Sequence, residues 1–191
     1  MAAASTVAAA TPAAAGILIN GYVHDGEWDG ARTLYPGSEG RLEAVRDSEF
    51  LYLKLTRPQE PMSGADLYIG RASERLFMLH VSSALSEDAD LKGQTAYEYG
   101  IWGKNADWTV NPINNYYDSN RKMQVVTPDA HEYQIALSKL PTGESKLMFV
   151  LKRPEARLPA GADEMKTDGW LRLDIGSVPF LRDAARRKGR G

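Results

Sequence analysis

The sequence predicts an all-β protein, an antiparallel β-sandwich of the jelly-roll kind with about ten strands and little helix. Two observations lead to this prediction. From residue 17 onward, short apolar or alternating runs are separated by clusters of Gly, Pro, Asn and Asp, which is the pattern of strands and turns. No stretch of comparable length keeps a helical period, and a parallel sheet would need crossover helices. Antiparallel strands are therefore favoured.

The expected strands differ in how deeply they should be buried. The run at 146–152 is apolar on both faces, which is typical of a central strand, whereas the run at 131–137 alternates apolar and polar residues. The segments expected as strands are ILIN (17–20), ARTLY (31–35), RLEAV (41–45), FLYLKLT (50–56), ADLYIG (65–70), RLFMLHV (75–81), TAYEYGIW (95–102), KMQVVT (122–127), HEYQIAL (131–137), KLMFVLK (146–152) and WLRLDI (170–175).

One domain with ragged ends is expected. A chain of 191 residues is long enough for one sizeable core and short for two. Its residues are 43% hydrophobic and 25% charged, which is ordinary for a folded, soluble domain. We expect the sandwich at 17–179. The Ala-rich residues 1–16 are expected to be a linker or the trimmed remnant of an export segment, and residues 180–191 a basic tail.

Charge and composition argue against several classes of function. The net charge is −2, and basic groups gather in the tail, so the body is acidic and unsuited to nucleic acid. No run approaches the roughly 20 apolar residues of a membrane span. Cysteine is absent, and His24, His80 and His131 lack the spacing of a zinc site. No nucleophile elbow, phosphate loop or dinucleotide motif occurs, so no enzyme is expected, although a glycosidase pair of carboxylates from distant strands stays open.

Six aromatic residues crowd into 95–117, and strand alternation sorts part of them. Tyr97 and Tyr99 share the face of an isoleucine and are expected in the core, whereas Trp102 leaves the strand on its polar face. A large ring exposed beside polar donors is where ligands stack. We therefore expect Trp102 to be accessible to a ligand.

Two further tryptophans are candidates. Trp170 lies opposite the apolar face of 170–175, so it is expected as a second exposed ring. Trp108 shares a strand face with the apolar residue Val110, which lies two positions later. A core position is therefore favoured for Trp108, and a surface position is the alternative.

The segment 111–120, NPINNYYDSN, is expected as a loop because Pro112 interrupts a strand. Its amides and tyrosines suit a sugar, whose C–H faces stack on rings while its hydroxyls need hydrogen bonds. A plain surface loop is the alternative. The candidate ligand-binding residues are Trp102, Trp108, Trp170, Asn114, Asn115 and Tyr116.

The segment ILINGYVHDGEWDGARTL, 17–34, resembles the start of the family 9 carbohydrate-binding modules and their DOMON-like relatives. Two later pieces, 47–55 and 132–144, are similar to the family in order and spacing. Asn20 stands where the family has an acid, and no binding residue carries over by alignment. The matching residues of the first segment are Ile19, Asn20, Gly21, Asp25, Glu27, Trp28 and Ala31.

The resemblance implies a sandwich that is exported, hence secreted or periplasmic, that is associated with carbohydrate-active enzymes, and that often binds calcium. Trp28 is interpreted as a buried ring at one end of the sandwich, with Asp25 and Glu27 fixing the adjoining turn. Asp25, Glu27 and Asp29 alternate and are the candidate oxygen ligands of Ca²⁺. A solvated acidic turn is the alternative.

The leading hypothesis is a non-catalytic carbohydrate-binding module with a saccharide as its partner. A haem-binding or redox DOMON-like domain stays open, because DOMON-like relatives include haem-binding domains. Met78 and His80 are a known pair of axial ligands on one strand face, but they lie side by side and could not hold one iron from both sides without a bend between them. The third hypothesis is an exported structural or interaction domain that keeps the fold without a small ligand.

Overall fold

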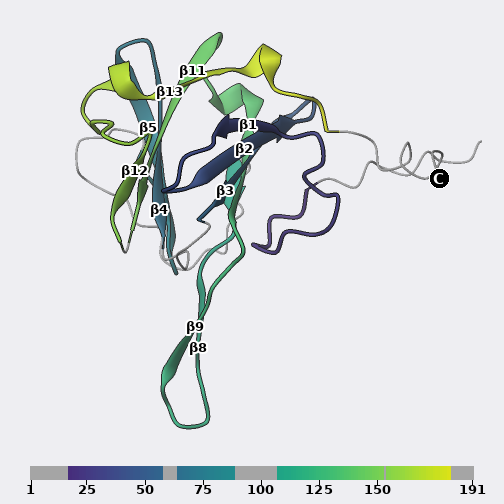
Figure 1. Cartoon of the computed structure of the whole chain (residues 1–191), viewed down its shortest axis with the longest axis vertical. Helices are drawn as coiled ribbons and strands as arrows, with labels where there is room; N and C mark the ends of the chain where they lie inside the picture. Colours follow the sequence, from purple (N-terminus) through teal and green to yellow (C-terminus); the bar gives the residue numbers. More distant parts are fainter. Residues whose placement is uncertain (1–16, 58–63, 89–106, 153, 182–191) are drawn as a thin grey trace, which may run out of the picture.

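The computed structural model describes residues 17–57, 64–88, 107–152 and 154–181. These residues form thirteen strands, arranged as two packed sheets and a separate two-stranded ribbon (Figure 1). Their helical segments are three short 3₁₀ turns, η1 (Leu137–Lys139), η2 (Thr167–Gly169) and η3 (Ile175–Ser177). None of the described helical segments has the length and apolar character that a membrane span needs. The prediction of an antiparallel, all-β fold is confirmed.

One layer of the sandwich, sheet A, has five strands in the order β1-β2-β3-β10-β7. All of its neighbours pair antiparallel, with the longest pairings in the centre, between β2, β3 and β10. Its strands are β1 (Arg32–Tyr35), β2 (Arg41–Arg46), β3 (Phe50–Thr56), β10 (His131–Ala136) and β7 (Trp108–Val110).

The second layer, sheet B, has six strands, with the order β12-β11-β4-β5-β6 and β13 also pairing with β11. Along β11, the first half pairs with β13 and the last residues pair with β12, so two short strands share one edge. Its strands are β4 (Ala65–Arg71), β5 (Glu74–Val81), β6 (Leu85–Asp88), β11 (Glu144–Leu151), β12 (Ala156–Leu158) and β13 (Leu171–Asp174).

The space between the sheets is filled by apolar side chains from alternate positions of both layers, as the period of two in the sequence predicts. Tyr133 of β10 and Phe149 of β11 meet edge to face across this space, with ring centroids 5.7 Å apart. Each sheet also turns a second face outward, and two loops cover part of those faces.

A β-bulge in the β4–β5 hairpin sets which residues lie opposite one another. Next to the turn, Gly70 pairs with Arg75, but Ile69 then pairs with Phe77, so one extra residue enters β5. Gly70 suits this position because a Cβ there would lie 2.6 Å from the carbonyl oxygen of Glu74. From the bulge onward every pairing in the hairpin is shifted by one residue, and Asp66 therefore lies opposite His80.

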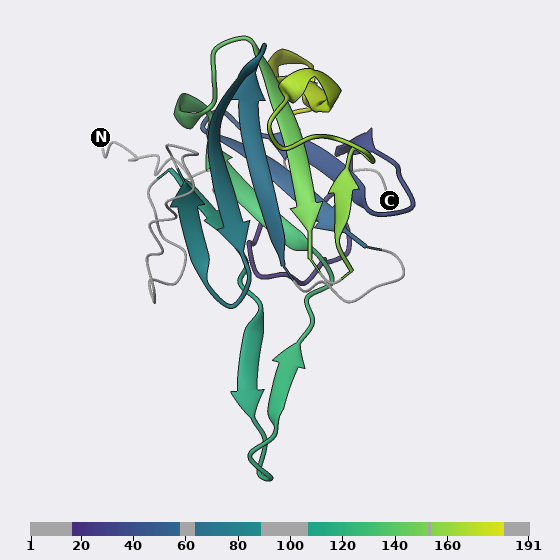
Figure 2. The ribbon, with the colours of Figure 1, turned by 90° about the vertical axis from the view of Figure 1, so that its left-hand side faces the viewer.

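The ribbon is the main difference from the expected fold. Strands β8 (Asn114–Tyr117) and β9 (Met123–Val126) pair antiparallel with each other and with no other strand of the described chain. They project as a narrow arm from one end of the sandwich (Figure 2). We call residues 114–126 the arm. The segment 111–120 was expected as a loop, and that prediction is wrong at β8: Pro112 interrupts the chain only after β7 has ended.

The other differences are at short segments. Residues 17–20 form no strand, and the short strands β6, β7 and β12 were not expected. Three or four residues are too few to show a period of two, which explains why these strands were missed. The expected strand at 95–102 lies outside the described residues.

Candidate functional site

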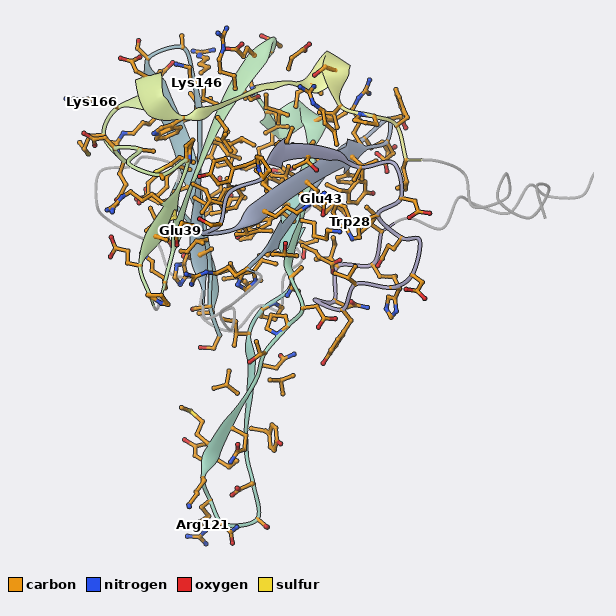
Figure 3. The ribbon with its side chains drawn as sticks, in the orientation of Figure 1. Trp28, Glu39, Glu43, Arg121, Lys146 and Lys166 are labelled. Atoms are coloured by element: carbon orange, nitrogen blue, oxygen red, sulfur yellow. The ribbon has the colours of Figure 1, made fainter. Side chains whose placement is uncertain are left out.

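Trp28 is buried, as predicted, but it belongs to the loop of residues 17–31 and packs on the outer face of sheet A, not at one end of the sandwich. Figure 3 shows it on the side of sheet A that faces away from sheet B. The indole N–H donates to Oε1 of Glu132, with the two atoms 3.0 Å apart. Nζ of Lys54 lies 5.0 Å from the centroid of the indole ring, which is a cation–π distance. Trp28 is thus an anchor of the fold and not a ligand-binding ring.

Glu132 is the buried acceptor that holds this loop in place. Its Oε2 accepts the backbone N–H groups of Gly21, at 2.9 Å, and Asn20, at 3.2 Å. Burial raises the pKa of Glu132 above its usual value, and the hydrogen bonds from Gly21, Trp28 and Asn20 offset only part of that effect. Sequence alternation placed Glu132 on the polar face of its strand but gave no sign of these bonds, because they join positions more than a hundred residues apart.

The three acids proposed for calcium, Asp25, Glu27 and Asp29, do not converge on one point. Oε1 of Glu27 accepts the N–H of Leu18 at 2.7 Å, and its Oε2 accepts the N–H of His24 at 3.2 Å. Glu27 therefore fixes the turn, as predicted. Within the part of the chain that the structure describes, no three His, Cys, Asp or Glu side chains are arranged to hold a metal ion.

Two of the predicted stacking rings are inside the protein. Trp108 lies in the core between the sheets, where its N–H donates to Oε2 of Glu87 at 2.7 Å. Trp170 is only 4% exposed, and the prediction that it is exposed is wrong. Alternation did place it on the face opposite to Leu173, but that outer face of sheet B has a small apolar core of its own, formed with Tyr68 and the loop before η2.

Trp102 lies outside the described residues, so its exposure stays a prediction. The other three predicted residues, Asn114, Asn115 and Tyr116, all lie on β8 of the arm. Tyr116 is 56% exposed and its neighbour Tyr117 is 72% exposed. Tyr116 was a candidate from the sequence, whereas Tyr117 was not, and the strand that presents both tyrosines was not predicted.

The arm has two unlike faces, because directly opposed residues and residues two apart share a face. Tyr116 pairs with Gln124, and Asn114 pairs with Val126, so one face places an exposed ring beside two amide side chains. Tyr117 and the predicted residue Asn115 occupy positions of the other face, where they lie opposite the exposed apolar residues Met123 and Val125. The first face offers both stacking and hydrogen bonding.

The turn that closes the arm is fixed by one carboxylate. Oδ1 of Asp118 accepts the N–H groups of Asn120 and Lys122, each at 2.9 Å, and Oδ2 accepts Nε2 of Gln124 at 3.0 Å. The N–H of Lys122, followed by that of Asn120, holds the pKa of Asp118 below its usual value. Arg121 lies at the tip (Figure 3). The turn therefore holds Gln124 in position, on the face of the arm that also carries Tyr116 and Asn114.

A second group of polar side chains lies on the outer face of sheet B. Oδ1 of Asp66 is 2.5 Å from Nδ1 of His80, and its Oδ2 is 2.7 Å from Nζ of Lys152. Nε2 of His80 is 3.0 Å from Oγ of Ser82. Burial acts to raise the pKa of Asp66, but the hydrogen bonds from His80 and Lys152 outweigh it, and the pKa lies below its usual value. The carboxylate is therefore ionised at neutral pH.

This geometry bears on the haem alternative. Both ring nitrogens of His80 have hydrogen-bond partners, so an iron at Nε2 would have to displace Ser82. Met78 lies on the same face of β5 but is buried against Tyr68 and Met148. The two side chains proposed as a haem pair are thus engaged in separate contacts.

Comparison with known proteins identifies no relative. No family model, no curated protein and no solved structure matches the chain. The resemblance to the family 9 carbohydrate-binding modules stays a prediction, and function has to be inferred from the described side chains.

Proposed function

We propose that the chain is a binding module whose arm holds a saccharide, and that it is non-catalytic toward this saccharide. The observation that supports this proposal is Tyr116, an exposed ring that shares one face of the arm with Asn114 and Gln124. A sugar ring presents C–H groups on its faces and hydroxyls at its edge, so it needs a flat apolar surface beside donors and acceptors. This face of the arm supplies both.

The arm is suited to reach an extended ligand. It stands clear of the sandwich in both views (Figures 1 and 2), so a chain of sugars is able to pass along it without meeting the body of the protein. A two-stranded ribbon is at best marginally stable in water on its own, and the bonds made by Asp118 hold this one together at its end. The ring of Tyr116 and the amides of Asn114 and Gln124 are therefore held in a fixed arrangement on the arm.

The expected affinity is weak. One stacked ring and a few hydrogen bonds that replace bonds to water supply little free energy, because each exchanged bond nets only about 0.5 to 1.5 kcal/mol. Weak binding suits a module that keeps another domain near its substrate. From the resemblance, we propose an exported module that accompanies a carbohydrate-active enzyme.

Replacing Tyr116 by Ala is expected to weaken saccharide binding about tenfold or more, because the stacking surface is lost. Tyr117→Ala is the matched control: it removes the same side chain from the opposite face of the same strand and should leave the affinity unchanged. A glycan array identifies the soluble oligosaccharide, and calorimetric titration then gives the affinity of the wild type and both variants.

Thermal melts of the three proteins show that the variants are folded, which is expected because both tyrosines are exposed. A glycan array with no ligand would contradict the proposal. Equal affinities of the wild type and Tyr116→Ala would remove Tyr116 from the site. A loss confined to Tyr117→Ala would move the ligand to the apolar face.

A further inference from the structure

Ser82, His80 and Asp66 lie in the order that the activation of a serine hydroxyl requires. Oγ of Ser82 is 3.0 Å from Nε2 of His80, and Nδ1 of His80 is 2.5 Å from Oδ1 of Asp66. Serine hydrolases of unrelated folds share this order of hydrogen bonds. In them the nucleophile is bonded to a general base, and the general base is bonded to a carboxylate that orients it. The three side chains come from two neighbouring strands and the turn after β5.

The positions of the protons follow from the partners. An ionised carboxylate only accepts hydrogen bonds, so Nδ1 of His80 bears the proton that is shared with Asp66. In the neutral imidazole Nε2 is then an acceptor that faces the hydroxyl of Ser82 at 3.0 Å. The carbonyl oxygen of Ala84 is a second acceptor for the same hydroxyl, at the longer distance of 3.3 Å. This is the tautomer in which His80 is able to remove the proton of Ser82.

Asp66 is the most buried of the three residues. The side chain of Asp66 is 10% exposed and that of His80 is 21% exposed, while Ser82 is half-buried. Nζ of Lys152 holds the second oxygen of Asp66 at 2.7 Å, which fixes the plane of the carboxylate. The orienting carboxylate is therefore the member best protected from water, whereas His80 and Ser82 are both partly exposed.

We infer that Ser82 is an activated nucleophile that accepts an acyl group from small activated esters. In this step Oγ of Ser82 forms a bond to the carbonyl carbon, and the bond between that carbon and the alcohol oxygen breaks. The proton of Ser82 passes to Nε2 of His80 and from there to the leaving alcohol. Water then attacks the carbonyl carbon of the acyl-serine while His80 takes its proton. The bond between that carbon and Oγ breaks, His80 returns the proton to Oγ, and the carboxylic acid is released.

The surroundings of Ser82 set how fast the reaction should be. Its backbone N–H is bonded to the carbonyl oxygen of Ala84 at 2.9 Å, and the N–H of Ala84 donates to Oγ of Ser82 at 3.2 Å. The second bond favours negative charge on Oγ, but both N–H groups are then engaged and do not form an oxyanion hole. Each missing oxyanion donor costs about 10² to 10³ in rate, so we expect labelling of Ser82 and slow turnover.

Ser83 is a matched control in the same turn. It is an exposed serine next to Ser82, and no hydrogen bond from it to an imidazole is present in the described part of the chain. The full chain is incubated with p-nitrophenyl acetate and, separately, with a fluorophosphonate probe, and the modified residue is identified by peptide mass spectrometry. We expect one label per chain, on Ser82, which is lost in Ser82→Ala and kept in Ser83→Ala.

His80→Gln tests the general base. Its removal is expected to slow the labelling of Ser82 by about 100-fold or more, because positioned general bases contribute about 10² to 10⁴ in rate. Thermal melts accompany each variant, and Ser82→Ala carries the test if His80→Gln does not fold. The absence of any label on the folded wild type would overturn the inference, as would a label on Ser83 or a rate at Ser82 that does not depend on His80. Saccharide binding by Ser82→Ala should stay unchanged, which separates this inference from the proposed function.

Discussion

Replacing Trp28 by Ala is expected to lower the free energy of unfolding by about 3 to 5 kcal/mol, through the cavity that it leaves. The ring is packed with Ile17, Val45 and Tyr52 over the outer face of sheet A. The substitution also removes one of the three donors to the buried carboxylate of Glu132. The loop of residues 17–31 should loosen with it, because the same carboxylate holds Gly21.

Urea denaturation of the wild type, Trp28→Ala and Trp28→Phe measures this effect. Trp28→Phe keeps an aromatic ring but loses the indole N–H. It should therefore lower the free energy of unfolding by less than Trp28→Ala does, and its effect shows how much the hydrogen bond to Glu132 contributes. An unchanged midpoint for Trp28→Ala would show that the ring is not a packing anchor, and it would remove a main support of the resemblance.

Acidification from pH 6.5 to pH 4 is expected to cost about 3 kcal/mol of stability through His131 alone. The imidazole is fully buried, and neither ring nitrogen has a hydrogen-bond partner in the described part of the chain. Burial lowers the pKa of His131 from 6.5 to about 4, and the backbone of Asn111 opposes only a small part of that effect. Between these values the unfolded chain binds a proton that the folded protein does not, so stability is complete above pH 6.5 and falls as the pH falls.

Other groups titrate differently and allow the effect to be isolated. The pKa values of Asp66 and Glu43 are lowered from 3.8 and 4.5, so any loss of stability through them begins at lower pH. The raised pKa of Glu132 acts in the opposite direction, because its folded form takes up a proton more readily. The two effects oppose each other as the pH falls, so the contribution of His131 is read from the difference between the wild type and His131→Leu in urea melts at pH 7, 6 and 5.

His131→Leu is the control for this prediction. It removes two unsatisfied ring nitrogens from the core, so the variant should be more stable than the wild type at pH 5 and should lose little stability between pH 7 and pH 5. If the free energies of unfolding of the wild type and of His131→Leu fall equally between pH 7 and pH 5, His131 is not the group that titrates.

The fold could be predicted from the sequence because alternation is a local signal. The runs of β3 and β10 alternate with a period of two, those of β5 and β11 are long and mostly apolar, and each is a strand in the structure. The buried position of Trp28 could also be predicted, because the motif around it is short and continuous. Both predictions rest on patterns among residues that are close together in the sequence.

The sites were harder to predict because they depend on what covers a face and on how strands align. For Trp170, alternation gives the face of the strand but not the loop that covers that face. For Asp66 and His80, a tight hairpin without a bulge would place Asp66 opposite Leu79. The single extra residue beside Gly70 brings the two side chains together, and nothing in the sequence shows on which side of the turn it enters.

The proposal that the arm holds the ligand is tested most directly by mapping where a saccharide binds. Amide chemical shifts of ¹⁵N-labelled wild-type protein are followed while the oligosaccharide selected on the glycan array is added. We predict that the largest shifts fall on the arm, at Asn114, Tyr116 and Gln124, with amides in the centre of the sandwich unmoved. Shifts confined to the sandwich, with the arm unchanged, would contradict the proposal.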